Sequence, residues 1–236
     1  MKFLITNDDG INGEGLLILV KAALKYGPVI VVAPKVEQSG KSHSLNLRVP
    51  LSLEKVNDII AGVETYVLDS TPADCVRVAN NYLHKDFDIV LSGVNEGYNI
   101  GDDVHYSGTI GAAIEGTIQK KKAIAISTDY YCLGGIKESL DEVLKFIFEN
   151  RILDEWDLYN VNIPLNHKGI RFCSQGETHY TCEIVEHERG VIALGKPLSD
   201  TKNESSDIYN IYQKYITITP LLSNFTNFDV LKKLLK

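Results

Sequence analysis

Residues 4–15, LITNDDGINGEG, pass from an apolar run into a loop of asparagine, glycine and two adjacent aspartates. The apolar residues predict a buried strand over residues 2–6, and Asp8 and Asp9 follow directly where that strand ends. Adjacent carboxylates repel one another, and burying even one unpaired carboxylate is costly. The pair therefore needs either full solvation in a turn or a cation that compensates its charge, and the two residues alone leave both possibilities open.

Strand and helix patterns alternate through the first two-thirds of the chain. Further strands are predicted at residues 29–34, 64–70, 87–93 and 123–127. Helices are predicted at residues 13–26, 70–83, 108–120 and 137–150. Thr71 is the expected N-cap of the second helix, with Pro72 in its first turn. Short connections between alternating strands and helices predict a three-layer α/β/α, Rossmann-like protein with a mostly parallel sheet.

The pattern changes after about residue 158. Strands with few helices between them are predicted at residues 158–164, 169–175, 182–188, 191–195 and 214–221, with an exposed loop at 198–207 and a short helix at 228–236. We therefore expect two units. Residues 1–157 form an α/β core that carries the functional site, and residues 158–236 form a β-rich extension with an oligomerisation hairpin and a C-terminal helix.

Composition narrows the classes of partner. The chain has 236 residues, 44% of them hydrophobic, and a formal charge of −7, which argues against a nucleic-acid duplex as a partner. No window approaches the roughly 20 apolar residues of a membrane span, and the first residues do not form a signal peptide. The four cysteines show no C-x-x-C spacing. A cytoplasmic protein with reduced cysteines is expected.

Three long polar loops follow strands that a parallel sheet would place side by side. They are NDDGINGEG after the first strand, APKVEQSGKSHS after the second, and VNEGYNIGDDVHYSGTIGAA after the strand at 87–93. Ligands of open α/β sheets bind at this carboxyl edge. With the three loops together, a divalent cation becomes the favoured partner of Asp8 and Asp9, and Ser39 and Asn95 offer neutral oxygens. An all-oxygen set favours one magnesium or manganese ion over zinc.

Two of these loops also contain candidate anion-binding groups. Gly40 and Ser42 offer an amide and a hydroxyl, although the loop lacks the spacing of a Walker A motif. His43 is either a proton donor or an ordinary surface histidine. Ser107, Gly108 and Thr109 begin a helix, where free N–H groups bind an anion or the serine simply caps the helix. Asp102 and Asp103 are either secondary ligands or residues that hold the loop together.

The ordered set of motifs resembles the SurE family of survival-protein nucleotidases. It consists of FLITNDDG, APKVEQSGKSHS, TPADCV, SGVNEGYNIGDDVHYSGTIGAAIEG and YITITPL. The resemblance implies a divalent-metal-dependent phosphomonoesterase acting on nucleoside 5′- and 3′-monophosphates and, in some members, on short polyphosphate. It also implies a homodimer or homotetramer that exchanges a C-terminal hairpin. Carried over residue by residue, the metal ligands are Asp8, Asp9, Ser39 and Asn95, and the phosphate side is Asn99, Ser107, Gly108 and Thr109.

The chain departs from the family pattern at three positions. Ser70 and Lys214 stand where the family usually has glycine, and Asn210 stands where it has alanine. Serine at a position with positive φ would be strained.

Two other functions fit the sequence less well. A haloacid-dehalogenase phosphatase is disfavoured because its acids are separated by one residue, and a nucleotide-binding sensor without turnover gives no reason for paired acids.

Overall fold

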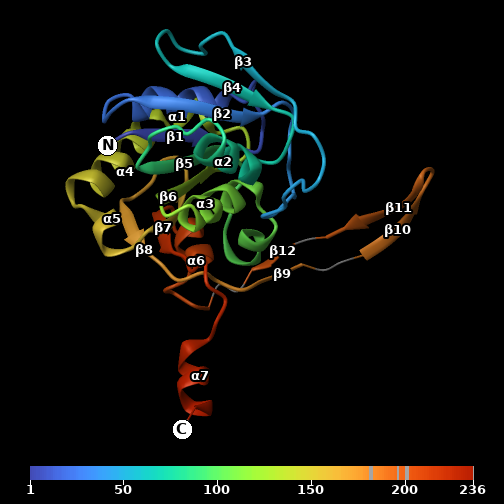
Figure 1. Ribbon diagram of the computed structural model, residues 1–236. Helices are drawn as coiled ribbons and strands as arrows, with labels where there is room; N and C mark the ends of the chain where they lie inside the picture. The colour runs from blue at the N-terminus through green and yellow to red at the C-terminus, as the bar shows by residue number, and fades with distance from the viewer. Residues whose placement is uncertain (181–182, 196, 200–201, 236) are drawn as a thin grey trace.

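The structure, a computed structural model, describes residues 1–180, 183–195, 197–199 and 202–235, and its centre is one nine-stranded sheet (Figure 1). The strand order is β3-β4-β2-β1-β5-β6-β7-β13-β8. The six strands from β4 to β7 in that order are parallel: β4 (Glu64–Leu68), β2 (Val29–Pro34), β1 (Phe3–Thr6), β5 (Ile89–Glu96), β6 (Lys122–Thr128) and β7 (Leu158–Ile163). The sheet reverses order beside β1, which places β1 at the switch point where open α/β sheets bind ligands.

Helices cover both faces of the sheet. One face carries α1 (Glu14–Ala23) and α4 (Lys137–Glu149), and the other carries α2 (Pro72–Asn81) and α3 (Gly108–Ile118). Strand β1 shows why two layers form: Phe3 and Ile5 pack into the α1 side, whereas Leu4 packs into the α2 side. This alternation is the two-residue period of a strand buried on both faces. The predicted three-layer, mostly parallel α/β class is confirmed.

Local signals placed the helices well. Thr71 caps α2, because its hydroxyl accepts a hydrogen bond from the Asp74 N–H at 3.2 Å, and Pro72 opens the helix. The elements that the prediction missed are short or lie at an edge: β3 (Leu53–Val56), α5 (Ile152–Glu155), β9 (Thr178–Tyr180), β12 (Pro197–Ser199), α6 (Asp207–Tyr212) and the 3₁₀ turns Gly101–His105 and Leu133–Gly135. Strand β12 overlaps the start of the loop that was predicted from residue 198. Helix α6 falls in polar sequence, where the prediction had a loop up to residue 207, and six residues show too little periodicity to reveal a helix.

The sheet continues beyond residue 158 with strands from the C-terminal part. Strand β13 (Ile216–Pro220) pairs antiparallel with β7, and β8 (Ile170–Phe172) pairs parallel with β13. The loop predicted at 198–207 and the strand predicted at 182–188 include residues 200–201 and 182, which lie outside the described residues. So does residue 236 of the predicted last helix, of which the structure shows α7 (Phe228–Leu234).

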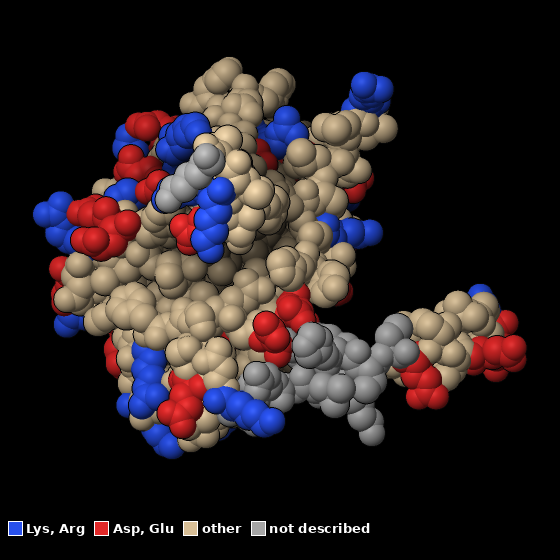
Figure 2. Space-filling model, turned by 90° about the horizontal axis from the view of Figure 1, so that it is seen from below, with Lys and Arg blue, Asp and Glu red and all other residues tan. Residues whose placement is uncertain are grey.

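Two segments extend from the body. Strands β10 (Glu183–His187) and β11 (Gly190–Leu194) form an antiparallel hairpin that stands clear of the sheet (Figures 1 and 2). It is joined to the body beside the pair of β9 (Thr178–Tyr180) and β12 (Pro197–Ser199). Helix α7 also points away and has no buried residue. Within the described ranges, no helix is long and apolar enough to cross a membrane.

The three departures from the family pattern have different consequences. Ser70 is not among the residues with positive φ, so the expected strain is absent. Asn210 is buried: its amide donates to the Glu204 and Ser206 carbonyls, and its oxygen accepts from Arg171 Nη1 at 2.9 Å. Lys214 follows the end of α6 with φ of 66°. Glycine relieves strain in that left-handed conformation.

We expect Lys214→Gly to stabilise the protein by about 1 kcal/mol, because glycine adopts positive φ without the steric cost of a Cβ. For a chain of this size that gain raises Tm by about 2–4 °C. The measurement is thermal unfolding followed by circular dichroism, with Lys214→Ala as the control that removes the charge but keeps the Cβ. An equal shift in both variants would contradict the backbone explanation.

Candidate functional site

A cavity of about 230 Å³ lies at the carboxyl edge of the sheet, where the loops after β1, β2 and β5 meet. Six predicted site residues line it, namely Asp8, Ser39, Gly40, Asn95, Asn99 and Ser107. They come from positions up to about a hundred residues apart in the chain and meet because parallel strands end at the same edge. Asp103 also lines the cavity. The lining therefore contains three of the four predicted cation ligands but not Asp9, which adjoins Asp8 in the chain. It contains three of the seven predicted phosphate-side residues.

Asp8 is buried beneath the start of α3. Its carboxylate accepts hydrogen bonds from the Thr109 hydroxyl and from the Thr109 N–H, the latter at 3.2 Å. Burial raises the pKa of Asp8, while the hydrogen bonds from Thr109 act in the opposite direction. A Cβ on Gly108 would lie 3.0 Å from the Asp8 Cβ, so glycine permits this close approach. Thr109 thus orients Asp8 instead of facing the cavity.

Asp9 is less buried than Asp8 and carries an unfavourable charge. Burial raises the pKa of Asp9 to about 7, and the negative charges of Asp8, Glu96 and Glu37 add to the increase. The ionised form of Asp9 is therefore destabilised in the folded protein. A bound cation would remove this penalty, because it supplies the opposite charge that the carboxylates require.

Hydrogen bonds also leave oxygen atoms of two neutral side chains, Asn95 and Ser39, available to a cation. The Asn95 amide nitrogen donates to the Gly97 carbonyl at 2.7 Å, which leaves the Asn95 side-chain oxygen as the group available to a ligand. The Ser39 hydroxyl donates a hydrogen bond to the Glu37 carboxylate at 2.6 Å, so its oxygen lone pairs are free to bind a cation. No group of three or more His, Cys, Asp or Glu side chains within the described part of the chain forms a metal cluster. Two acids with hydroxyl and amide oxygens still fit a hard divalent cation.

The N-terminus of α3 borders the cavity, but part of its donor set is already used. The Ser107 hydroxyl accepts from the Ile110 N–H at 3.2 Å, and the Thr109 N–H is bound to Asp8. Ser107 is therefore the cap of α3 as well as a lining residue. The remaining positive end of the helix dipole still favours an anion in the cavity.

Asn99 is held in place by a cluster that the sequence analysis did not identify. Its side chain donates to the Ser127 hydroxyl at 2.8 Å. Its backbone carbonyl accepts from Asn160 at 2.7 Å and from Asn162 at 3.0 Å, and its N–H donates to the Asn162 oxygen at 2.8 Å. Asn160 and Asn162 are buried on β7, where asparagine is unusual. The N-x-N spacing within that predicted strand was the available signal.

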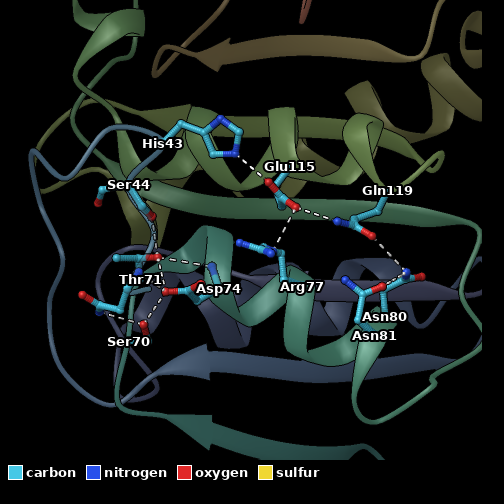
Figure 3. Close-up of polar contacts among 11 residues, drawn as sticks. His43, Ser44, Ser70, Thr71, Asp74, Arg77, Asn80, Asn81, Glu115 and Gln119 are labelled. Atoms are coloured by element: carbon cyan, nitrogen blue, oxygen red, sulfur yellow. Dashed lines mark hydrogen bonds and ion pairs between the residues drawn. The ribbon is translucent and has the colours of Figure 1, made fainter. Parts of the chain in front are cut away.

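Ser42 and His43 are turned away from the small cavity. The Ser42 hydroxyl donates to the His105 carbonyl at 2.6 Å, and the Ser42 N–H donates to the Tyr106 carbonyl at 3.0 Å. His43 Nε2 lies 2.8 Å from Glu115 on α3 (Figure 3). Both residues instead line a larger cavity of about 650 Å³ that is shared with residues 220–222 and 224–229. Their contacts hold the loop after β2 against α3.

The same loop is also bound to α2 (Figure 3). The Ser44 carbonyl accepts from the Thr71 hydroxyl at 2.8 Å, and the Asn46 N–H donates to Asp74 at 2.8 Å. Ser70 joins this network, because its hydroxyl donates to Asp74 at 2.6 Å and accepts from the Asn46 amide at 2.9 Å. Glycine at position 70 would lack both bonds. The loop that presents Ser39 is thus anchored on two helices.

Fold and site together define a three-layer α/β protein with a polar cavity, lined by Asp8 and by hydroxyl and amide groups, at the topological switch point of its sheet. The family model described as survival protein SurE matches residues 3–182, and the chain belongs to the SurE family. It is similar over its full length to proteins named 5′-nucleotidase SurE. The relative from Clostridium beijerinckii is 37% identical, with 100% of this chain and 98% of the relative covered.

Two further relatives agree. A protein of the same name from Clostridium botulinum is 39% identical, with 99% of this chain and 97% of the relative covered. The crystal structure of the SurE protein from Aquifex aeolicus has a TM-score of 0.83 and 32% identity, with 99% and 98% of the two chains covered. The resemblance noted in the sequence is confirmed. So is the prediction that the chain is an enzyme of the 5′-nucleotidase class.

The raised pKa of Asp9 predicts a pH-dependent instability in the metal-free protein. Because the folded pKa is about 7 and the ordinary value is 3.8, this group's contribution to stability is lost as the pH rises from about 4 through 7. Asp9→Asn removes the penalty. At pH 8 with a chelator we expect the variant to be more stable than the wild type by about 1 kcal/mol, and to show no advantage at pH 4.

Denaturant unfolding at both pH values measures this difference. The same variant should lose the increase in unfolding free energy that saturating Mn²⁺ or Mg²⁺ gives the wild type, which is about 2.7 kcal/mol when the free ion is at a hundred times Kd. Asp102→Asn, which changes an acid that is not among the four proposed cation ligands, is the matched control. A metal-free Asp9→Asn protein less stable than the wild type at pH 8 would refute the electrostatic account.

Proposed function

We propose that this protein is a divalent-metal-dependent phosphomonoesterase that hydrolyses nucleoside 5′-monophosphates, and also 3′-monophosphates and short polyphosphate. The observation that carries the proposal is the pair Asp8 and Asp9, whose ionised forms are disfavoured at a site bordered by the N-terminus of α3. A cation bound between these carboxylates and a phosphate would explain both the paired acids and the nearby helix N-terminus. It would reduce the repulsion between the carboxylates, and together with the helix dipole it would attract the phosphate.

Asp8, Asp9, Ser39 and Asn95 would hold one divalent cation per subunit, either magnesium or manganese. Such a cation neutralises charge on phosphoryl oxygens and lowers the pKa of water when it is bound. The other residues act on the phosphate itself. Gly40, Asn99 and Ser107 line the cavity where the phosphate would lie, and the dipole of the helix that begins at Gly108 stabilises negative charge there. Thr109 keeps the Asp8 carboxylate oriented toward the site.

His43 and Ser42 do not line the small cavity, but they hold the loop that contributes Ser39 and Gly40 to it. Their hydrogen bonds to Glu115 and to the His105 carbonyl set the path of the loop that carries Ser39 and Gly40. Glu115 is itself buried and also accepts from Gln119 at 2.7 Å. This arrangement favours a role for His43 in shaping the phosphate-binding loop.

Asp8→Asn should abolish nearly all phosphatase activity, a loss of about 100-fold or more, while the protein stays folded. Asparagine keeps the shape of the side chain and removes a charge that burial disfavours, so stability should not fall. Release of inorganic phosphate from adenosine 5′-monophosphate with Mn²⁺ is the assay, and Asp102→Asn is the control. Activity near that of the wild type in Asp8→Asn would end the proposal.

The rival function is a nucleotide-binding module without turnover. It predicts that the wild type binds nucleoside monophosphates but releases no phosphate from any of them, whichever divalent metal is supplied. A panel of 5′- and 3′-monophosphates and short polyphosphate, each tested with Mg²⁺ and Mn²⁺, separates the two functions. The same panel identifies the preferred substrate and ion.

We further propose that the protein is cytoplasmic and forms a homodimer or homotetramer through its C-terminal hairpin. The β10–β11 hairpin supports this because its apolar side chains are exposed on both faces: Val191 is 72% exposed and Ile192 is 42% exposed. A projecting apolar hairpin is suited to pairing with another copy of the chain.

Replacing Val191 and Ile192 by glutamate should convert the oligomer to a monomer, because the charges make burial of either hairpin face costly. Light scattering of the purified full chain measures the mass. Leu47→Glu, at an exposed apolar residue of the body, is the matched control. An unchanged mass in the hairpin variant would argue against this interface.

A further inference from the structure

The cavity that contains the site is too small to enclose a whole nucleotide. Its volume is about 230 Å³, below the roughly 300–1,000 Å³ of pockets that enclose ligands of that size. Asp8, Ser39 and Asn95 occupy its lining together with Asn99 and Ser107. A phosphoryl group with its cation would fill this space, and the sugar and base of a nucleotide would then lie at its mouth.

Three tyrosines line this cavity, and they differ in exposure. Tyr98 is half-buried and its hydroxyl hydrogen-bonds Asp129. Tyr106 is 62% exposed and Tyr130 is 65% exposed. Aromatic rings that remain open to solvent beside a polar cavity are available to stack on a planar ligand group.

The ring of Tyr130 rests on the backbone of Gly97. A Cβ at residue 97 would lie 2.9 Å from both Cζ and Oη of Tyr130, so any other residue there would displace the ring. Gly97 also has φ of 119°, a conformation that side chains rarely adopt. One face of the Tyr130 ring therefore packs on the main chain of Gly97, two residues after the proposed ligand Asn95.

The segment that carries Tyr130 is attached to the same strand end. The Gly97 N–H donates to the Thr128 carbonyl at 2.9 Å, and the Tyr131 N–H donates to Glu96 at 3.1 Å. The Tyr130 N–H donates to Asp129 at 2.9 Å, and Asp129 is bound by Tyr98. These hydrogen bonds hold the backbone of the segment, and Gly97 supports one side of the ring, so little conformational entropy is lost when a base stacks on it.

We propose that Tyr130 is a specificity-determining residue that stacks on the purine or pyrimidine base of the substrate. This inference rests on the proposed nucleotidase function and assigns its base-binding surface. The phosphate and cation contacts are shared by all phosphomonoesters, whereas the exposed tyrosine ring favours only those with an aromatic group. Tyr130 therefore lowers KM for nucleotides and leaves the reacting atoms untouched.

The test compares adenosine 5′-monophosphate with ribose 5-phosphate, which keeps the sugar and phosphate but lacks the base. We expect Tyr130→Ala to raise KM for the nucleotide about tenfold, since stacking on one base contributes about 1–3 kcal/mol. For ribose 5-phosphate KM should stay within twofold, and kcat should be unchanged for both. Tyr130→Phe should restore the wild-type KM, because phenylalanine keeps the ring.

Tyr131→Ala is the matched control, since Tyr131 is 96% exposed, neighbours Tyr130 and does not line the cavity. Equal KM values of the wild type and Tyr130→Ala for the nucleotide would overturn the inference, as would equal increases for both substrates. Neither result would affect the proposed function. A wild-type protein that hydrolyses neither substrate would instead remove the proposed function itself.

Discussion

The uncompensated negative charge at the end of β1 is the constraint on which the site depends. Asp8 is buried and Asp9 lies beside it, with the charges of Glu37 and Glu96 adding to the repulsion. A fold selected for stability alone has little reason to keep such a group of acids, because each ionised carboxylate here costs free energy. A bound cation would make the arrangement favourable. Under the proposed function, the metal-free fold is therefore less stable than the cation-bound one, as is typical of functional sites.

The rest of the site is built to hold oxygens around that charge. Thr109 orients Asp8, the Glu37 carboxylate accepts a hydrogen bond from the Ser39 hydroxyl, and the Gly97 carbonyl accepts one from the Asn95 amide. Behind them, the loop after β2 is bound to α3 through His43 and to α2 through Ser44 and Asn46. Rigid support of this kind lets short polar side chains act together without a large ordering cost on binding.

The three departures from the family pattern differ in their effect on the structure: two form new hydrogen bonds, and one leaves a strained backbone conformation. Ser70 gains two hydrogen bonds to the Asn46–Asp74 network and needs no special backbone conformation. Asn210 uses its polar groups fully, and its partner Arg171 stacks on the Tyr215 ring at 3.6 Å. Lys214 keeps the left-handed conformation that glycine would adopt freely. The first two substitutions form new contacts, whereas the third retains strain.

The sequence by itself determined the α/β class, the cap of α2 and the candidate ligands Asp8, Asp9, Ser39 and Asn95. Strand alternation, helix capping and polar loops after strands are local patterns, and the SurE motifs combine them in order. The division at residue 157 stays a prediction, although β7, β13 and β8 extend the central sheet beyond it.

Only the tertiary structure decided which way the loop residues face and which distant groups support them. Ser42 and His43 turn to η1 (Gly101–His105) and α3, Asn160 and Asn162 hold Asn99, and Tyr130 lies on Gly97. These contacts join residues 33 to 72 positions apart in the chain. Their partners depend on strand order and helix packing, which local sequence patterns do not encode.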